Sequence, residues 1–169
     1  MFAFCLGLQL DWRICGGYVK IRILIQVQKE NPMCLSIEQI ELIKKFLIDK
    51  LNPYLIIVFG SAAHERMRPD SDIDVAYMSD RGQATDEHGR FMLAQEMAGF
   101  LDRDVHLVDL RRASTVLQAQ VVARGKVILD REPLRRQEIF MLVLQEYARL
   151  NEERAPILAK IKERGTIYA

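Results

Sequence analysis

Apolar residues recur along the chain with two different periods, and each period predicts one type of element. Between residues 37 and 47, isoleucines and leucines stand three or four positions apart, which places them on one face of an α-helix. Ser36 precedes this run and Gln39 follows three residues later, a pair that caps the start of a helix reciprocally. We therefore expect an amphipathic helix from residue 36 to about residue 50.

Four short apolar segments predict the strands of a sheet. Residues 54–59 are six consecutive apolar or aromatic side chains, too few for a buried helix and suited to a strand covered on both faces. A second strand is expected over residues 72–78, because a turn-like sequence with serine, aspartate and glycine closes it. Further strands are expected over residues 104–109 and 126–129.

Helical segments separate and follow these strands. They are expected over residues 86–101 and 114–125, and then over residues 133–151 and 156–165, where a proline opens each of the last two. Strands that alternate with helices predict the α/β or α+β class. We expect a mixed central sheet flanked by helices, with further helices at the C-terminus.

The first 32 residues differ from the rest, because they mix glycines with short apolar pieces and end at an asparagine–proline pair. We expect residues 1–32 to be an N-terminal extension that is dispensable, and Met33 is a candidate natural start. Residues 33–169 are then expected to form one domain. No internal repeat is visible in either part.

Composition limits the class of protein. The 169 residues are 50% hydrophobic and 28% charged, which is enough apolar surface for one globular core. The net charge is +1, so a general nucleic-acid-binding surface is not expected. Charged residues interrupt every apolar stretch before it reaches membrane-spanning length. Three cysteines, all within the first 34 residues, favour free thiols in a reducing cytoplasm over a disulfide framework.

One pattern carries candidate chemistry. Gly60 and Ser61 end the first predicted strand, and Asp72 and Asp74 follow after ten intervening residues. Where a strand turns into a helix, exposed backbone N–H groups favour phosphate oxygens, and the Ser61 hydroxyl can add a contact. The alternative for the glycine–serine pair alone is an ordinary strand-to-helix turn capped by serine.

The two aspartates favour a phosphate-binding site over an ordinary capped turn. Residues two apart in a strand point to the same face, so Asp72 and Asp74 should present paired carboxylates while the residues between them face the other way. Aspartate is depleted in strands, which makes a merely solvated pair a poor explanation. Paired oxygen ligands beside a phosphate-binding turn predict a Mg²⁺ site for nucleotidyl transfer, with Mn²⁺ as an alternative metal.

This pattern resembles the DNA polymerase β nucleotidyltransferase superfamily, in particular its minimal nucleotidyltransferase branch, the MntA-type antitoxins. The segment 103–114 and the tail 146–168 are also similar to that family, so the resemblance covers about residue 33 to the C-terminus. It implies a bacterial protein that uses ATP and Mg²⁺ to transfer AMP to a tyrosine of a cognate HEPN-domain ribonuclease toxin. It also implies that Asp72 and Asp74 bind metal and that Gly60 and Ser61 bind the triphosphate.

His106 departs from the family pattern, because the family usually has a third carboxylate at this position of the later strand. Imidazole is a poor ligand for Mg²⁺, but it suits Mn²⁺ or Zn²⁺ and can act as a general base. His106 is therefore a candidate catalytic residue, and a histidine with no catalytic role is the alternative. Asp104 shares its expected face, whereas Asp109 has the opposite parity.

A second departure follows the glycine–serine pair. His64 and Glu65 replace the basic residue and the glycine that the family has soon after the serine. Arg66 is the candidate that restores the missing phosphate contact, and Arg68 could contribute as well. Arg66 is accordingly assigned to nucleotide binding.

Two other functions compete with protein AMP transfer. A catalytically impaired member of the fold could neutralise its partner by binding alone, and transfer of a nucleotide to a small molecule would normally need a further domain. Residues 139–144 are six consecutive apolar side chains that cover every side of a helix. We expect them to be buried against the toxin or a second copy of this chain, and an internal helix is the alternative.

Overall fold

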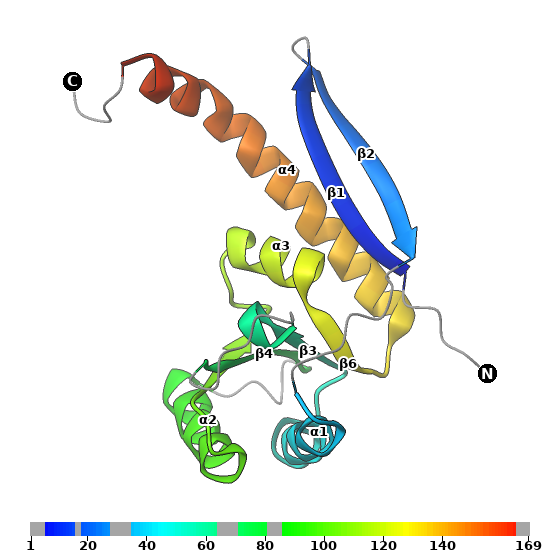
Figure 1. Ribbon diagram of the computed structural model, residues 1–169, viewed down its shortest axis with the longest axis vertical. Helices are drawn as coiled ribbons and strands as arrows, with labels where there is room; N and C mark the ends of the chain where they lie inside the picture. Colours follow the sequence, from blue (N-terminus) through cyan, green and yellow to red (C-terminus); the bar gives the residue numbers. More distant parts are fainter. Residues whose placement is uncertain (1–5, 16–17, 28–34, 64–70, 81–85, 165–169) are drawn as a thin grey trace.

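The computed structural model describes residues 6–15, 18–27, 35–63, 71–80 and 86–164, with side chains described for residues 35–63, 71–80 and 86–156. Figure 1 shows a sheet whose two faces are both covered by helices. This arrangement confirms the predicted class. In the described residues, no helix is both long and apolar enough to cross a membrane.

The main sheet has four strands in the order β5-β4-β3-β6. Its members are β3 (Leu55–Phe59), β4 (Ile73–Met78), β5 (Val105–Asp109) and β6 (Lys126–Asp130). β3 pairs antiparallel with both β4 and β6, whereas β4 and β5 run parallel. The sheet is therefore mixed, as the sequence predicted.

The helices form two layers on the sheet. α1 (Ile37–Leu51) and α2 (Glu87–Leu101) cover one face, and α3 (Thr115–Arg124) and the first part of α4 (Pro133–Arg164) cover the other (Figure 1). Alternate residues of each strand supply the two cores, as the pleat requires. The core under α1 and α2 takes Ile56, Val58, Ile73, Val75, Tyr77 and Leu107, and the core under α3 and α4 takes Leu55, Ile57, Ala76 and Met78.

Side chains cap the start of three helices, and the pair predicted from the sequence is one of them. Ser36 and Gln39 form the complete capping box of α1, with each side chain accepting the other residue's backbone N–H. The Asp86 carboxylate caps α2, and the Ser114 hydroxyl accepts the Leu117 N–H at the start of α3. Such side chains satisfy backbone donors that the first turn of a helix cannot pair internally.

The C-terminal part differs from expectation. One helix, α4, continues from Pro133 to Arg164, although separate helices were expected over residues 133–151 and 156–165. Pro156 lies inside it. A proline removes one backbone donor and crowds the carbonyl four residues earlier. The alanine, glutamate, arginine and leucine residues around it are strong helix formers, which offsets that penalty.

The N-terminal extension contains a hairpin that we did not anticipate. β1 (Leu6–Cys15) and β2 (Tyr18–Val27) pair antiparallel over ten residues each and form a separate two-stranded sheet. β1 contacts α3, so the hairpin lies on the α3 side of the molecule (Figure 1). That residues 1–32 are dispensable stays a prediction.

Candidate functional site

The glycine–serine pair and the two aspartates meet at one end of the main sheet. β3 ends at Phe59, opposite Asp74 in the antiparallel register, and the next residues form a short 3₁₀ helix, η1 (Gly60–Ala63). On the other side of β4, Asp74 is the register neighbour of His106. Three segments that are far apart in the sequence therefore converge on Asp74.

Asp74 and His106 face the same side of the sheet. Val75 and Leu107, the residues that follow them, pack in the core under α1 and α2, whereas Ala76 packs in the core under α3. This alternation agrees with the predicted orientation of Asp74. Asp72 differs slightly from expectation, because it lies one residue before β4 begins, and its side chain is exposed.

The carboxylate of Asp74 lies at the edge of the core. Its side chain is 26% exposed, and burial raises the pKa of Asp74 above the ordinary aspartate value. His106 opposes this change in pKa by hydrogen bonding, with 3.4 Å between its Nδ1 and Oδ1 of Asp74. The negative charge of Asp72 adds to the increase in the pKa of Asp74. A cation beside both carboxylates would favour their charged forms.

Gly60 has a steric role that the motif alone does not reveal. Its φ angle is +65°, a conformation that residues with a side chain rarely adopt. A Cβ atom at this position would also collide with Oδ2 of Asp74. Glycine therefore lets the backbone of η1 pack directly against the carboxylate.

Ser61 connects the two halves of the motif. Its hydroxyl donates a hydrogen bond to the backbone carbonyl of Asp72, at 3.5 Å. This bond holds the start of η1 beside the residue that leads into β4. A hydroxyl has two acceptor lone pairs as well as its donor, so Ser61 can still contact a further polar group.

Comparisons with known proteins identify the family of this chain. The family model described as Polymerase beta, Nucleotidyltransferase matches residues 41–134. This chain belongs to that nucleotidyltransferase family. It is 40% identical over 105 residues to the protein adenylyltransferase MntA of Shewanella oneidensis, an alignment that covers 62% of this chain and 73% of MntA.

Solved structures give the same result for the fold. A toxin–antitoxin crystal structure with AMP-PNP matches with a TM-score of 0.66 and 37% identity, covering 73% of this chain and 98% of the other. A tri-AMPylated HEPN toxin from Shewanella oneidensis in complex with its MNT antitoxin matches with a TM-score of 0.62 and 35% identity, over 74% and 97% of the two chains. The nucleotidyltransferase fold inferred from the sequence is confirmed.

Two further acidic candidates lie at the two ends of β5, Asp104 just before its first residue and Asp109 at its last. Asp104 is exposed, and its backbone carbonyl accepts the Ile73 N–H at 2.8 Å. Asp109 is buried, accepts the Arg111 N–H at 3.0 Å and lies 3.6 Å from the Arg112 guanidinium. Asp109 therefore stabilises the turn after β5 and does not reach Asp74.

The structure does not describe the candidate residues that follow the 3₁₀ helix η1. Arg66, together with His64, Glu65 and Arg68, lies outside the described residues. The role of Arg66 in nucleotide binding stays a prediction from the sequence.

The described residues supply two neighbouring carboxylates, but they do not supply a complete set of metal ligands. Among them, no three histidine, cysteine, aspartate or glutamate side chains form a group that could hold a metal ion. Mg²⁺ that acts with nucleotides is usually bound by one or two carboxylates, and substrate phosphates and water complete its coordination. Asp72 and Asp74 fit this requirement, because they are two neighbouring carboxylates whose mutual repulsion, which raises the pKa of Asp74, a cation would offset.

Proposed function

We propose that this chain transfers AMP from ATP to a tyrosine of a partner HEPN-domain toxin and thereby acts as its antitoxin. The observation that carries the proposal is the direct packing of Gly60 against Asp74, which joins both halves of the motif at one end of the sheet. The relatives support the substrate and the partner, because they include a protein adenylyltransferase, an AMP-PNP complex and a tri-AMPylated HEPN toxin.

In the proposed reaction, the tyrosine oxygen attacks the α-phosphorus of ATP. A new phosphorus–oxygen bond forms to tyrosine, the bond to the β-phosphate bridging oxygen breaks, and pyrophosphate leaves with its electron pair. The phenolic proton is released, so the products are AMP-tyrosine, pyrophosphate and one proton. This reaction uses ATP, which supports a cytoplasmic location for the protein.

Each residue of the motif has a separate role in this proposal. Gly60 allows the η1 backbone to approach the phosphates closely, and Ser61 contributes its hydroxyl to the same group. Asp72 and Asp74 would hold Mg²⁺, or Mn²⁺, which supplies charge stabilisation to the transferred phosphoryl group when bound. Arg66 is assigned to the phosphates from the sequence alone.

The surface of α4 provides candidate contacts for the partner. Val143 is buried and Phe140 is half-buried against the core, whereas Met141 and Leu142 are 72% and 60% exposed. The apolar run is thus divided between the chain's own core and the surface. We assign the exposed pair to the toxin interface, and a second copy of this chain is the competing occupant.

A binding-only antitoxin is the second candidate function. It is favoured by His106, which occupies the strand position next to Asp74 without supplying negative charge at neutral pH. In that case the protein would inhibit the toxin without transferring AMP.

A transfer assay with labelled ATP, a divalent cation and the HEPN-domain toxin proposed as its partner distinguishes the two functions. We expect label on a toxin tyrosine with the wild type, and loss of about a hundredfold or more in rate with Asp72→Asn or Asp74→Asn. Asp49→Asn is the matched control, because Asp49 is an exposed aspartate on α1, outside the motif. Toxin inhibition without label would establish the binding-only function instead.

A further inference from the structure

His106 lies on the flank of Asp74 that is opposite the glycine–serine turn. The main sheet has the order β5-β4-β3-β6, so β4, which carries Asp74, separates β3 from β5. Gly60 and Ser61 directly follow β3, and His106 is the register neighbour of Asp74 on β5. Neighbouring strands of a sheet lie about 4.8 Å apart. Asp74 therefore lies between the proposed phosphate-binding turn and the imidazole of His106.

The β5 flank of Asp74 is the side from which an acceptor has to approach. Phosphoryl transfer places the attacking and the leaving oxygen roughly in line, on opposite sides of the phosphorus. In the proposed function, Gly60 and Ser61 bind the triphosphate, so the pyrophosphate leaves on the β3 side. The acceptor hydroxyl then attacks from the β5 side, where His106 is the residue paired with Asp74.

The imidazole of His106 has one nitrogen near Asp74 and a second one available to a substrate. Nδ1 lies 3.4 Å from Oδ1 of Asp74, and this is the polar contact of the ring within the described residues. The two nitrogens of an imidazole point in different directions, so Nε2 faces away from that carboxylate. The His106 side chain is 67% exposed. An approaching side chain can therefore reach Nε2 without displacing core residues.

Imidazole and phenol are suited to each other as hydrogen-bond partners. A phenolic hydroxyl can both donate and accept, whereas a ring nitrogen of histidine accepts or donates according to its protonation state. Nε2 of His106 can therefore contact a tyrosine hydroxyl in either state. The contact orients the hydroxyl and does not require the ring to take up a proton.

We propose that His106 binds the acceptor tyrosine, with Nε2 hydrogen-bonded to the phenolic hydroxyl that attacks the α-phosphorus. This inference rests on the proposed function, because it needs a nucleotide at the turn and a tyrosine as acceptor. His106 holds the attacking oxygen in line with the leaving pyrophosphate. It neither coordinates a metal nor acts as the general base.

Transfer kinetics with labelled ATP and the HEPN-domain toxin test this role through the length of the side chain at residue 106. A glutamine amide reaches about as far as Nε2 of histidine, whereas an asparagine amide reaches only about as far as Nδ1. We expect His106→Asn and His106→Ala to lower kcat/KM for the toxin about tenfold, which corresponds to a lost hydrogen bond of about 1.4 kcal/mol. His106→Gln should stay within about threefold of the wild type. The KM for ATP should change less than about twofold in all three variants.

His88→Ala is the matched control, because His88 is an exposed histidine on α2, outside the motif. It should leave all kinetic constants unchanged. A loss of about a hundredfold in His106→Gln would show that His106 takes up the phenolic proton, and the positioning role would be wrong. An unchanged kcat/KM for the toxin in both His106→Asn and His106→Ala would also overturn the proposal.

Toxin binding in the presence of α,β-methylene-ATP tests the same contact without transfer, because the carbon bridge of this analogue prevents release of pyrophosphate. The toxin variant replaces the labelled tyrosine by phenylalanine, which removes only the hydroxyl. Its effect on Kd and that of His106→Ala should be coupled by about threefold to tenfold, since both changes remove one hydrogen bond. Additive effects on Kd would show that His106 and the hydroxyl are not in contact, which would refute the proposal.

The wild-type protein separates this inference from the proposed function. If the wild type transfers no label to the toxin, the enzymatic function is wrong and the acceptor role of His106 is wrong with it. If the wild type labels a toxin tyrosine but the His106 variants behave like His88→Ala, the enzymatic function stands and the acceptor role alone is refuted.

Discussion

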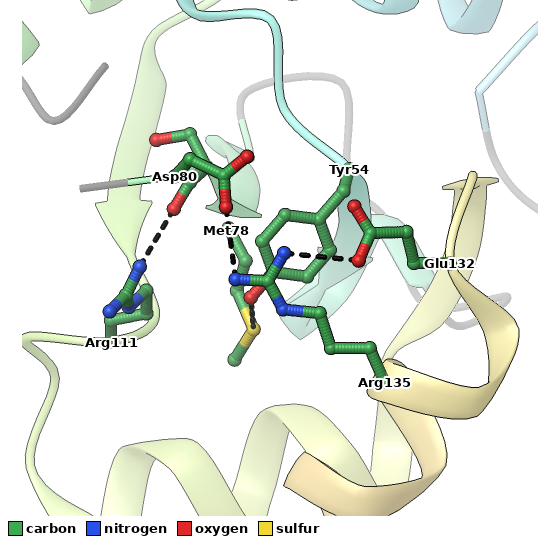
Figure 2. A network of polar contacts seen from close by, with 7 residues as sticks. Tyr54, Met78, Asp80, Arg111, Glu132 and Arg135 are labelled. Carbon is green, nitrogen blue, oxygen red and sulfur yellow. Dashed lines mark hydrogen bonds and ion pairs between the residues drawn. The ribbon is translucent and has the colours of Figure 1, made fainter. Parts of the chain in front are cut away.

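The charged residues at the two ends of the main sheet differ in how closely they are paired with opposite charges. At the end where β4 leaves the sheet, the Arg135 guanidinium lies 3.0 Å from carboxylate oxygens of both Asp80 and Glu132 and stacks 4.0 Å from the centre of the Tyr54 ring (Figure 2). Arg111 donates to the Ser79 carbonyl beside them at 2.9 Å. These contacts hold the start of α4 against the sheet.

The opposite end carries acids with much weaker pairing. In the described residues, Asp74 has an exposed imidazole at 3.4 Å as its ion-pair partner, and the charge of Asp72 disfavours ionisation of Asp74. The first end neutralises its carboxylates with cations of its own chain, whereas the second keeps them available to a ligand. We infer that the first end serves stability and the second serves function, and this division can be tested.

Gly60→Ala should have the largest effect, and mainly on activity. The new Cβ would collide with Asp74, and alanine does not tolerate the positive φ of this position. Displacing the carboxylate should lower the transfer rate about a hundredfold. We expect the free energy of unfolding to fall by about 1–3 kcal/mol as well. Transfer kinetics and chemical denaturation measure the two effects.

Gly99→Ala is the matched control for that variant. Gly99 lies in α2, and an added Cβ would meet no atom within 4 Å. Alanine in a helix interior is more stable than glycine by about 0.5–1 kcal/mol. Gly99→Ala should therefore stabilise the protein slightly and leave transfer unchanged. Equal loss of transfer in the two variants would show that Gly60 has no special role.

Tyr77, near the end of β4 that leads to Asp80, predicts a pH dependence of stability. Burial raises the pKa of Tyr77 to about 12, and the charge of Asp109 adds to the increase. Folding therefore favours the protonated phenol, so its contribution is complete below pH 10 and is lost as the pH rises toward 12. Over that window, the free energy of unfolding should fall by on the order of 2 kcal/mol.

Tyr77→Phe tests this dependence. The hydroxyl of Tyr77 is buried without a hydrogen-bond partner in the described residues, so its removal should not lower stability at pH 7. The variant should lose less stability than the wild type between pH 10 and 12 in urea denaturation. Tyr54, whose pKa burial also raises, is present in both proteins and cancels in the comparison. Identical pH profiles would show that Tyr77 titrates as an ordinary tyrosine.

Arg135→Met should lower the free energy of unfolding and leave the transfer rate unchanged, whereas Gly60→Ala at the other end of the sheet should lower both. Methionine keeps much of the aliphatic stem but leaves Asp80 and Glu132 without their shared cation. We expect a loss of about 1–2 kcal/mol in the free energy of unfolding, because several partners are lost together. Arg149→Met, which breaks one exposed pair with Glu153, should cost less than about 0.5 kcal/mol.

The strands of the main sheet and the helices around it were predicted well, because the sequence patterns that specify them are local. The serine cap of α1, the apolar run of β3 and the proline that opens α4 each determine their element without distant contacts, and each lies at its expected place. The hairpin was missed for a different reason. Every second residue of its strands is apolar on either side of Gly16 and Gly17, but apolar residues and a glycine among the intervening positions blur this period-two pattern.

The candidate site was predictable in part. The spacing of Gly60, Ser61, Asp72 and Asp74 identified a motif, but the collision that excludes a side chain at residue 60 depends on the antiparallel register of β3 and β4. The closeness of His106 to Asp74 likewise requires β5 to lie parallel to β4. The contacts of Arg135 with Tyr54, Asp80 and Glu132 could not be predicted from the sequence. These residues are separated by up to 81 positions and share no sequence pattern.

Removing residues 1–32 should have the smallest effect on either end of the sheet. β1 and β2 pair with each other and add no strand to the main sheet, and the motif begins only at Gly60. The family match also starts later, at residue 41. A chain that begins at Met33 should therefore keep its transfer rate within about twofold and its free energy of unfolding within about 0.5 kcal/mol. Parallel transfer assays and urea denaturation of the two chains measure both quantities. A loss of stability well beyond this range would show that the contact between β1 and α3 supports the fold, and that the extension belongs to the domain.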